Sequence, residues 1–229
     1  MRVDLNADLG EGVTDDDGLL AVVTSANVAC GFHAGDEATM RTVCRGAALR
    51  GVVIGAQVSY ADREGFGRRA MDVPAAELSA WVREQVSLLT AIAESEGTAV
   101  AYLKPHGALY NRVVEDEEQA RAVLAGAADL PVLGLPGGVF LELASAEGRA
   151  VFTEGFPDRG YTPTGRLVPR DQPGALVTDG GQIAGNAVRL AKGVDSVCVH
   201  GDSPSAVAHA VAVRRALAAA DCRVEPFLR

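Results

Sequence analysis

Residues 74–104 read PAAELSAWVREQVSLLTAIAESEGTAVAYLK and contain the two patterns that decide the fold. In the first part, buried-type side chains recur at steps of three and four, the spacing of one helix face: Leu78, Trp81, Val82, Gln85, Leu89 and Ile92. Pro74 suits the first turn of a helix and Gly97 suits its end. The short apolar run that follows ends at Lys104. The stretch predicts a helix over residues 74–96 and then a strand.

The same alternation of short apolar runs and longer helical patterns continues along the chain. Strands are expected at residues 2–6, 25–30, 52–58, 99–104, 132–135, 150–154 and 195–200, with an extra strand at 222–227. Weaker helical patterns cover 117–128 and 182–191, and another begins at Ser203 and Pro204. Such alternation is typical of βα units around a parallel sheet, and 229 residues suffice for one barrel. We expect one α/β domain over residues 1–229, a single (β/α) barrel that is seven-stranded or irregular.

Composition excludes several classes of protein. The chain has 21 Lys and Arg against 30 Asp and Glu, a net charge of −9, which argues against nucleic-acid and anionic-membrane partners. The four cysteines form no CxxC pair, so reduced thiols are expected rather than disulfides or a zinc ribbon. There is no apolar run of signal-peptide or membrane-spanning length. We expect a soluble, cytoplasmic protein.

One stretch lacks any period. Residues 155–178 contain four prolines and three arginines, and loops of this length are usually functional. This segment is the candidate lid or substrate clamp. Arg159 and Arg170 within it are candidate binders of an anionic substrate.

Polar side chains collect where the predicted strands end, which is where parallel α/β folds build their sites. In chain order they are Asn6, Asp8, Glu11, Asn27, His33, Asp36, Gln57, Ser59, Tyr60, Asp62, Lys104, His106, Asn111, Glu154, Asp158, Arg159, His200 and Asp202. Three of the four histidines belong to this group, and the fourth, His209, lies within a helical pattern. The sequence therefore predicts one site at the carboxyl ends of the strands.

Six segments, in order along the chain, resemble the LamB/YcsF family. They are DLNADLGE (4–11), SANVACGFHAGD (25–36), SYADREGFGRR (59–69), LKPHGALYN (103–111), EGFPDRGY (154–161) and VHGD (199–202). GFHAGD and KPHGALYN are highly specific, and the resemblance covers nearly the whole chain. One position departs from the family pattern: Gln57 stands where the family usually has a histidine, although an amide could still hold a substrate carbonyl.

The resemblance implies both a fold and an activity. The fold is a barrel related to sugar and polysaccharide deacetylases. The activity is the ATP-dependent opening of the lactam of 5-oxo-L-proline to L-glutamate by a prokaryotic 5-oxoprolinase, with Mg²⁺ accompanying ATP. It also implies two partners, the B and C subunits, similar to carboxyltransferase or allophanate-hydrolase domains. Which of the subunits binds ATP stays open, as do the oligomeric state and a protein-bound metal.

Opening a lactam requires activation of the amide oxygen, deprotonation of water and protonation of the ring nitrogen. Carboxylates, imidazoles and a cation suit these tasks, so the candidate catalytic residues are Asp8, Glu11, His33, Lys104, His106 and Glu154. The candidate substrate-binding residues are Asn6, Asn27, Gln57, Tyr60, Asn111, Arg159, Arg170, His200 and Asp202. Lys104 and His106 are two residues apart at a strand end, so alternation places both on the same side.

Several of these residues also have a purely structural explanation. Asp8 and Glu11 could be carboxylates favoured near a helix start, as could Asp202. Asp36 could cap a helix beginning at Glu37. Glu154 and Arg159 could form a surface ion pair of negligible energy.

Two other functions remain open. The deacetylase relationship suggests a metal-dependent hydrolase of a carbohydrate amide, with Asp8, His33 and His106 around the metal. Gln57 counts against that interpretation. The other alternative is a non-catalytic protein that binds 5-oxoproline for its partners.

Overall fold

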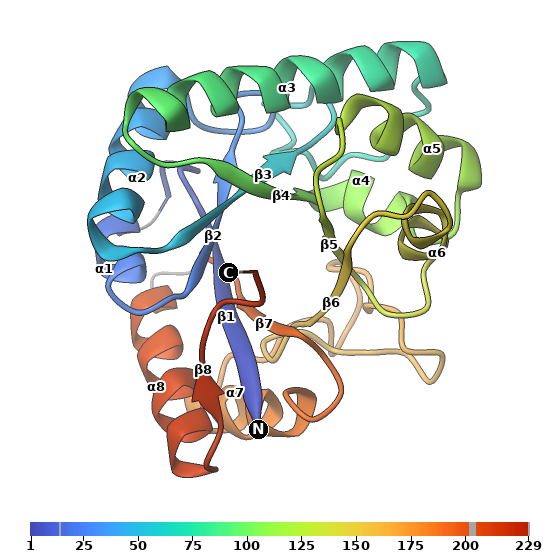
Figure 1. The fold of residues 1–229 in the computed structure, drawn as a ribbon. Helices are drawn as coiled ribbons and strands as arrows, with labels where there is room; N and C mark the ends of the chain where they lie inside the picture. The colour runs from blue at the N-terminus through green and yellow to red at the C-terminus, as the bar shows by residue number, and fades with distance from the viewer. Residues whose placement is uncertain (14, 202–204, 229) are drawn as a thin grey trace.

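The computed structural model describes residues 1–13, 15–201 and 205–228. Its strands are β1 (Arg2–Leu9), β2 (Ser25–Ala29), β3 (Val53–Val58), β4 (Val100–Pro105), β5 (Val132–Gly134), β6 (Val151–Gly155), β7 (Ser196–Val199) and β8 (Arg223–Val224). Strands β1 to β7 pair in parallel in the order β2-β3-β4-β5-β6-β7-β1, and β1 pairs again with β2. In the described part of the chain, seven strands thus form a closed barrel, as predicted (Figure 1).

Helices surround this ring of strands (Figure 1). They are α1 (Asp16–Leu20), α2 (Glu37–Arg50), α3 (Ala75–Ser95), α4 (Gly107–Arg112), α5 (Glu117–Gly126), α6 (Val139–Ala146), α7 (Gly180–Leu190) and α8 (Ala206–Ala219). The helices predicted at 74–96, 117–128 and 182–191 are confirmed as α3, α5 and α7, with small differences at their ends. The expected helix start at Ser203 and Pro204 lies outside the described residues.

Two predicted strands need correction. β1 continues to Leu9 rather than ending at Asn6, because its polar residues face the barrel interior and do not mark the end of the strand. The extra strand predicted at 222–227 is limited to β8, which pairs with the start of β1 outside the ring.

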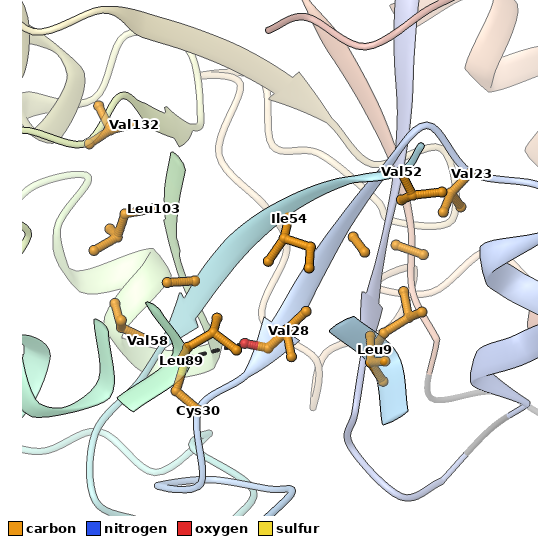
Figure 2. Close-up of a cluster of buried hydrophobic side chains, with 14 of the residues drawn as sticks. Leu9, Val23, Val28, Cys30, Val52, Ile54, Val58, Leu89, Leu103 and Val132 are labelled. Carbon is orange, nitrogen blue, oxygen red and sulfur yellow. Dashed lines mark hydrogen bonds between the residues drawn. The ribbon is translucent and has the colours of Figure 1, made fainter. Parts of the chain in front are cut away.

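Apolar side chains of the strands pack against the helices outside the barrel. Figure 2 shows part of this layer, with Leu9, Val28, Ile54 and Leu103 from four neighbouring strands and Leu89 from α3. All five are fully buried. Burying apolar area on this scale is the main stabilising contribution to such a fold.

Three aromatic side chains pack together at one end of the barrel interior. Phe227, near the C-terminus, lies with its ring centroid 4.9 Å from that of Tyr102 and 4.6 Å from that of Phe152. Figure 1 shows the segment that follows β8 running toward the middle of the ring. These rings pack together at the end of the barrel where the strands begin, opposite the carboxyl ends of the strands.

Between these rings and the carboxyl ends of the strands, the barrel interior is polar. Alternation along a strand sends every second side chain inward, and the register places the inward residues of neighbouring strands side by side. Asn27 lies beside Asp8, and Lys104 beside Gln57. A barrel interior is more often filled with branched apolar side chains. Here hydrogen-bonded polar groups take their place, and they lead directly to the site.

Among the described residues, no helix is both long and apolar enough to cross a membrane. The four cysteines are unpaired and buried, as expected.

Candidate active site

A cleft of about 1070 Å³ opens at the carboxyl ends of the strands. Asp8 of β1 and Lys104 of β4 lie on its floor. His106 and His200, which directly follow β4 and β7, lie there too. The segment between β6 and α7 forms one wall, with residues 166–171 lining the cleft. The cleft therefore lies where the site was predicted, and the long loop lines it, while the role of this loop as a lid or clamp stays a prediction.

Lys104 is the central residue of the floor. Its ammonium nitrogen Nζ lies 2.9 Å from Glu154 Oε2, 3.3 Å from Asp8 Oδ1 and 3.2 Å from Cys198 Sγ. The Lys104 side chain is only 3% exposed. Burial alone would lower the pKa of this lysine, but the carboxylate of Asp8 and its other neighbours raise it well above the ordinary value. Lys104 is therefore a buried, permanent cation.

The two carboxylates beside Lys104 differ in their electrostatics. Burial opposes ionisation of Asp8, yet the positive charge of Lys104 holds the pKa of this carboxyl well below its usual range. Burial raises the pKa of Glu154 despite the same lysine. Asp8 lines the cleft and Glu154 does not. Asp8 is thus the ionised carboxylate that a ligand meets, whereas Glu154 neutralises Lys104 from behind.

A network of amides and hydroxyls holds this group from below. Asn27 Nδ2 donates to Asp8 Oδ1 at 2.8 Å and to Asn6 Oδ1 at 2.7 Å. Tyr102 Oη donates to Asn27 Oδ1 at 2.6 Å. Asn6 Nδ2 donates to Ser196 Oγ at 2.6 Å. Asn6 and Asn27 were predicted to bind substrate, but both are fully buried and orient the residues that line the cleft.

Two stacked imidazoles flank the other side of Asp8. The rings of His33 and His106 are nearly parallel, with centroids 4.0 Å apart. His106 lines the cleft, and burial together with the neighbouring His33 holds the pKa of His106 well below its usual range. His106 is therefore neutral at pH 7. Its Nε2 lies 3.1 Å from the carbonyl oxygen of Phe66, so Nε2 carries the proton and Nδ1 is an acceptor.

Gln57 connects His106 to Glu11. The amide Nε2 of Gln57 lies 2.9 Å from His106 Nδ1 and 3.1 Å from Glu11 Oε1, and it donates to both. Burial raises the pKa of Glu11. His33 Nδ1 lies 2.9 Å from Ser59 Oγ, and His33 Nε2 lies 3.5 Å from Glu11 Oε1. Glu11, His33 and Gln57 therefore lie behind His106, and none of the three lines the cleft.

Glu11, His33 and His106 could in principle hold a metal ion, because their ligand atoms lie within 4.8 Å of one another. In this arrangement, however, the N–H groups of Gln57 point at two of the three ligand atoms. The predicted alternative set of Asp8, His33 and His106 fits less well, since Asp8 Oδ2 lies 4.0 Å from His106 Nδ1 and its Oδ1 is bonded to Asn27 and Lys104. The residues as arranged do not fit a metal.

His200, at the end of β7, pairs with an aspartate that was not a primary candidate. Its Nδ1 lies 2.9 Å from Asp158 Oδ2, and its ring stacks on Phe156 with a centroid separation of 5.2 Å. Burial would raise the pKa of Asp158, but His200 lowers it. His200 lines the cleft, as predicted. Asp202 lies outside the described residues.

Arg159 braces the loop between β6 and α7 from within. Its Nε donates to the carbonyl oxygen of Ala175 at 3.0 Å, and its Nη2 donates to that of Val168 at 2.7 Å. Burial lowers the pKa of Arg159 to about 10. Arg159 and Glu154 do not form the surface ion pair that was the alternative explanation for them. Arg170 lines the cleft on this loop, as an anion-binding residue would.

Three other candidates are held by structural contacts. Tyr60 is fully buried and its hydroxyl donates to Gln119 Oε1 at 3.0 Å, tying the end of β3 to α5. Asn111 lines the cleft, and its amide donates to the carbonyl of Gly107. Asp36 caps α2 by accepting a hydrogen bond from the Thr39 amide at 2.8 Å, so the structural explanation of this residue is confirmed.

Sequence reasoning missed Tyr110. Its hydroxyl is buried next to the carboxyl group of Glu154, and burial together with this carboxyl raises the pKa of Tyr110 well above its ordinary value. Tyr110 also lines the cleft, as Lys104 does. Its position in KPHGALYN, one helical turn after His106, was the available signal.

The comparisons with known proteins agree with this geometry. Residues 3–229 match the LamB/YcsF family. The chain belongs to this family. It is 56% identical to the A subunit of 5-oxoprolinase from Streptomyces avermitilis, covering 98% of this chain and 99% of that protein. It is 51% identical to the A subunit of 5-oxoprolinase from Mycobacterium avium, covering 98% of each.

Two solved structures share the fold of this chain. The lactam utilization protein of Thermus thermophilus superposes with a TM-score of 0.92 at 38% identity, covering 99% of this chain and all of that one. A family 4 carbohydrate esterase from Streptomyces lividans has a TM-score of 0.55 at 13% identity, covering 97% of this chain and 91% of that one. The second similarity shows the fold alone, which is the barrel expected from the sequence.

In this LamB/YcsF chain, Asp4 lies beneath the floor of the cleft and accepts hydrogen bonds from three hydroxyl groups. Thr24 and Ser25 each donate to Asp4 Oδ1 at 2.6 Å, and Ser196 donates to Oδ2. Since Ser196 also accepts from Asn6, Asp4 supports the amide network beneath Lys104. Burial raises the pKa of Asp4 to about 6.

This raised pKa predicts a pH-dependent stability. The folded chain binds the Asp4 proton more tightly than the unfolded chain. The resulting contribution of Asp4 to the free energy of unfolding is fully present below the ordinary pKa of 3.8 and is lost as the pH rises through 6. The shift corresponds to about 3 kcal/mol. We expect the Asp4→Asn variant, which cannot ionise, to lack this loss. Urea unfolding of both proteins across this range measures it, and identical pH profiles would contradict it.

Proposed function

We propose that this chain is the lactam-opening subunit of a multi-subunit, ATP-dependent 5-oxoprolinase. The observation that carries the proposal is the floor of the cleft, where a buried cation, an ionised carboxylate and a neutral imidazole meet (Lys104, Asp8 and His106). Full-length similarity to proteins named as the A subunits of 5-oxoprolinases supports the choice of substrate. The word "subunit" in those names supports the partners expected from the sequence.

The chemistry begins at the lactam oxygen. Transfer of the γ-phosphoryl group of ATP to this oxygen gives an imidate phosphate, and ATP would arrive as its Mg²⁺ complex. Water adds to the activated carbon, the C–N bond breaks as the ring nitrogen takes a proton, and γ-glutamyl phosphate remains. A second water hydrolyses it to glutamate and phosphate. Charge builds up on oxygen at each step, so a fixed cation stabilises the transition states.

The floor residues fit these steps. Lys104 provides the fixed positive charge beside the reacting oxygen. Asp8 has Oδ1 occupied by Asn27 and Lys104, which leaves Oδ2 to accept a proton from water. His106 carries a proton on Nε2, now hydrogen-bonded to the carbonyl of Phe66, and we assign this N–H a hydrogen bond to the ring nitrogen. The proton that the ring nitrogen takes is the one that Asp8 removed from water. Tyr110 places its buried hydroxyl beside Glu154 at the wall of the same cleft.

Glutamate release tests the proposal. The chain is incubated with 5-oxo-L-proline, and ATP or either partner is left out in turn. Release that needs ATP and both partners is expected. Turnover of an N-acetylated sugar without ATP would favour the deacetylase-like alternative instead. Binding of 5-oxoproline that survives in every assembly, with no glutamate released, would identify a non-catalytic binding protein.

A further inference from the structure

A cluster of side chains behind the cleft has the composition of a metal site, but its hydrogen bonds do not suit metal binding. Glu11, His33 and His106 supply one carboxylate and two imidazoles, all buried, from three separate segments of the barrel rim. This is the ligand composition of many transition-metal sites in proteins. Metal ligation requires a free lone pair on each of these atoms.

The amide of Gln57 takes up two of those lone pairs. Its Nε2 lies between His106 Nδ1 and Glu11 Oε1, at 2.9 and 3.1 Å. The orientation of this amide follows from its neighbours. The Phe66 carbonyl oxygen, 3.1 Å from His106 Nε2, accepts the proton of that nitrogen, so Nδ1 of a singly protonated ring is an acceptor. The NH₂ group of Gln57 can donate to both His106 Nδ1 and Glu11 Oε1.

We propose that Gln57 excludes metal ions from the Glu11–His33–His106 cluster by filling the cation position with two N–H donors. The same two hydrogen bonds fix His106 in the form that carries its proton on Nε2. Gln57 is thus a positioning residue, because it does not line the cleft and acts through His106. The inference is independent of the proposed reaction, since it concerns only what the cluster can bind.

Replacing Gln57 is expected to allow the Glu11–His33–His106 cluster to bind a metal ion. An imidazole at position 57 offers a lone pair from the same strand position in place of two N–H groups. Gln57→His therefore gathers three imidazoles and a carboxylate, a complete set of ligands for Co²⁺ or Zn²⁺. Gln57→Ala removes the two donors without adding a ligand and leaves the three original groups.

The test is a titration of the metal-free chain with Co²⁺ alone. Visible d–d absorption and the shift in melting temperature report binding, and no activity is needed. Wild type is expected to show neither signal. Gln57→His is expected to bind one ion per chain and to melt at a higher temperature with Co²⁺ than without, because an ion that binds only the folded state stabilises it. Adding His33→Ala to Gln57→His should abolish both signals.

Two results would overturn the proposal, and a second variant covers the case in which Gln57→His does not fold. Stoichiometric Co²⁺ binding by wild type that His33→Ala abolishes would show that the Gln57 amide turns over and admits a metal. Absence of binding by Gln57→His would show that Gln57 is not the determinant. If Gln57→His fails to fold, Gln57→Ala decides the question, with weaker but His33-dependent Co²⁺ binding as the expected result and no binding as the contrary one.

Discussion

Replacing Lys104 by methionine is expected to reduce glutamate release by at least about 10²–10³-fold, the effect of losing one fixed charge-stabilising donor. The free energy of unfolding is expected to fall by about 3–5 kcal/mol, because two buried carboxylates lose their shared cation. Those carboxylates belong to Asp8 and Glu154, 3.3 and 2.9 Å from the ammonium nitrogen. Turnover is measured in the complete assembly with ATP, and stability by urea unfolding of the chain.

Two further variants separate catalysis from stability. The chain has one other lysine, the exposed Lys192, so Lys192→Met is the matched control and should change neither quantity. Adding Glu154→Gln to Lys104→Met removes one uncompensated charge and should recover part of the stability but none of the activity. Near-normal turnover by Lys104→Met would remove this lysine from the reacting centre.

The second large effect is expected for His106→Ala. Loss of one positioned hydrogen-bond donor at the reacting centre typically lowers kcat by about 10²–10³-fold. Binding of 5-oxoproline should change little, since Lys104 and the rest of the floor remain. Calorimetry measures binding and glutamate release measures kcat. The histidine of α8, His209, provides the control His209→Ala, which should behave as wild type.

The split between binding and turnover is the informative result for His106. A variant that loses affinity and kcat/KM in equal proportion, with kcat unchanged at saturation, would show that His106 holds the substrate equally in its ground and transition states. A variant with unchanged kcat and unchanged affinity would remove His106 from the mechanism altogether.

The sequence predicted the barrel and the edge at which the site lies because both depend on local patterns. Apolar runs and helical periods define the βα units, and polar residues after each strand mark the cleft. Lys104 and His106 were recognised in this way, and both line the floor. The roles assigned to them remain predictions, as do those of the other candidates.

What the sequence could not predict is which side chains meet. Glu154 was considered together with Arg159, five residues away, but its partner is Lys104 on another strand. Asp4 was overlooked, and Asn6 was expected at a strand end, because nothing local distinguishes an inward polar residue from the end of a strand. Gln57 was considered as a substrate ligand, yet its amide N–H groups are bonded to Glu11 and His106. These contacts depend on register across the ring.

The closure of the ring also bears on how the protein is made. β1 completes its pairing only with β7, and the hydrogen bond from Ser196 to Asp4 spans 192 residues. Contacts between such distant positions form slowly, because a long loop must close before they stabilise anything. During synthesis on the ribosome, β1 emerges first and can pair with β2, but Asp4 and Asn6 lack their bonds to Ser196 until β7 follows. The cleft therefore takes shape late and in one step, so a nascent or truncated chain has nothing to offer a ligand.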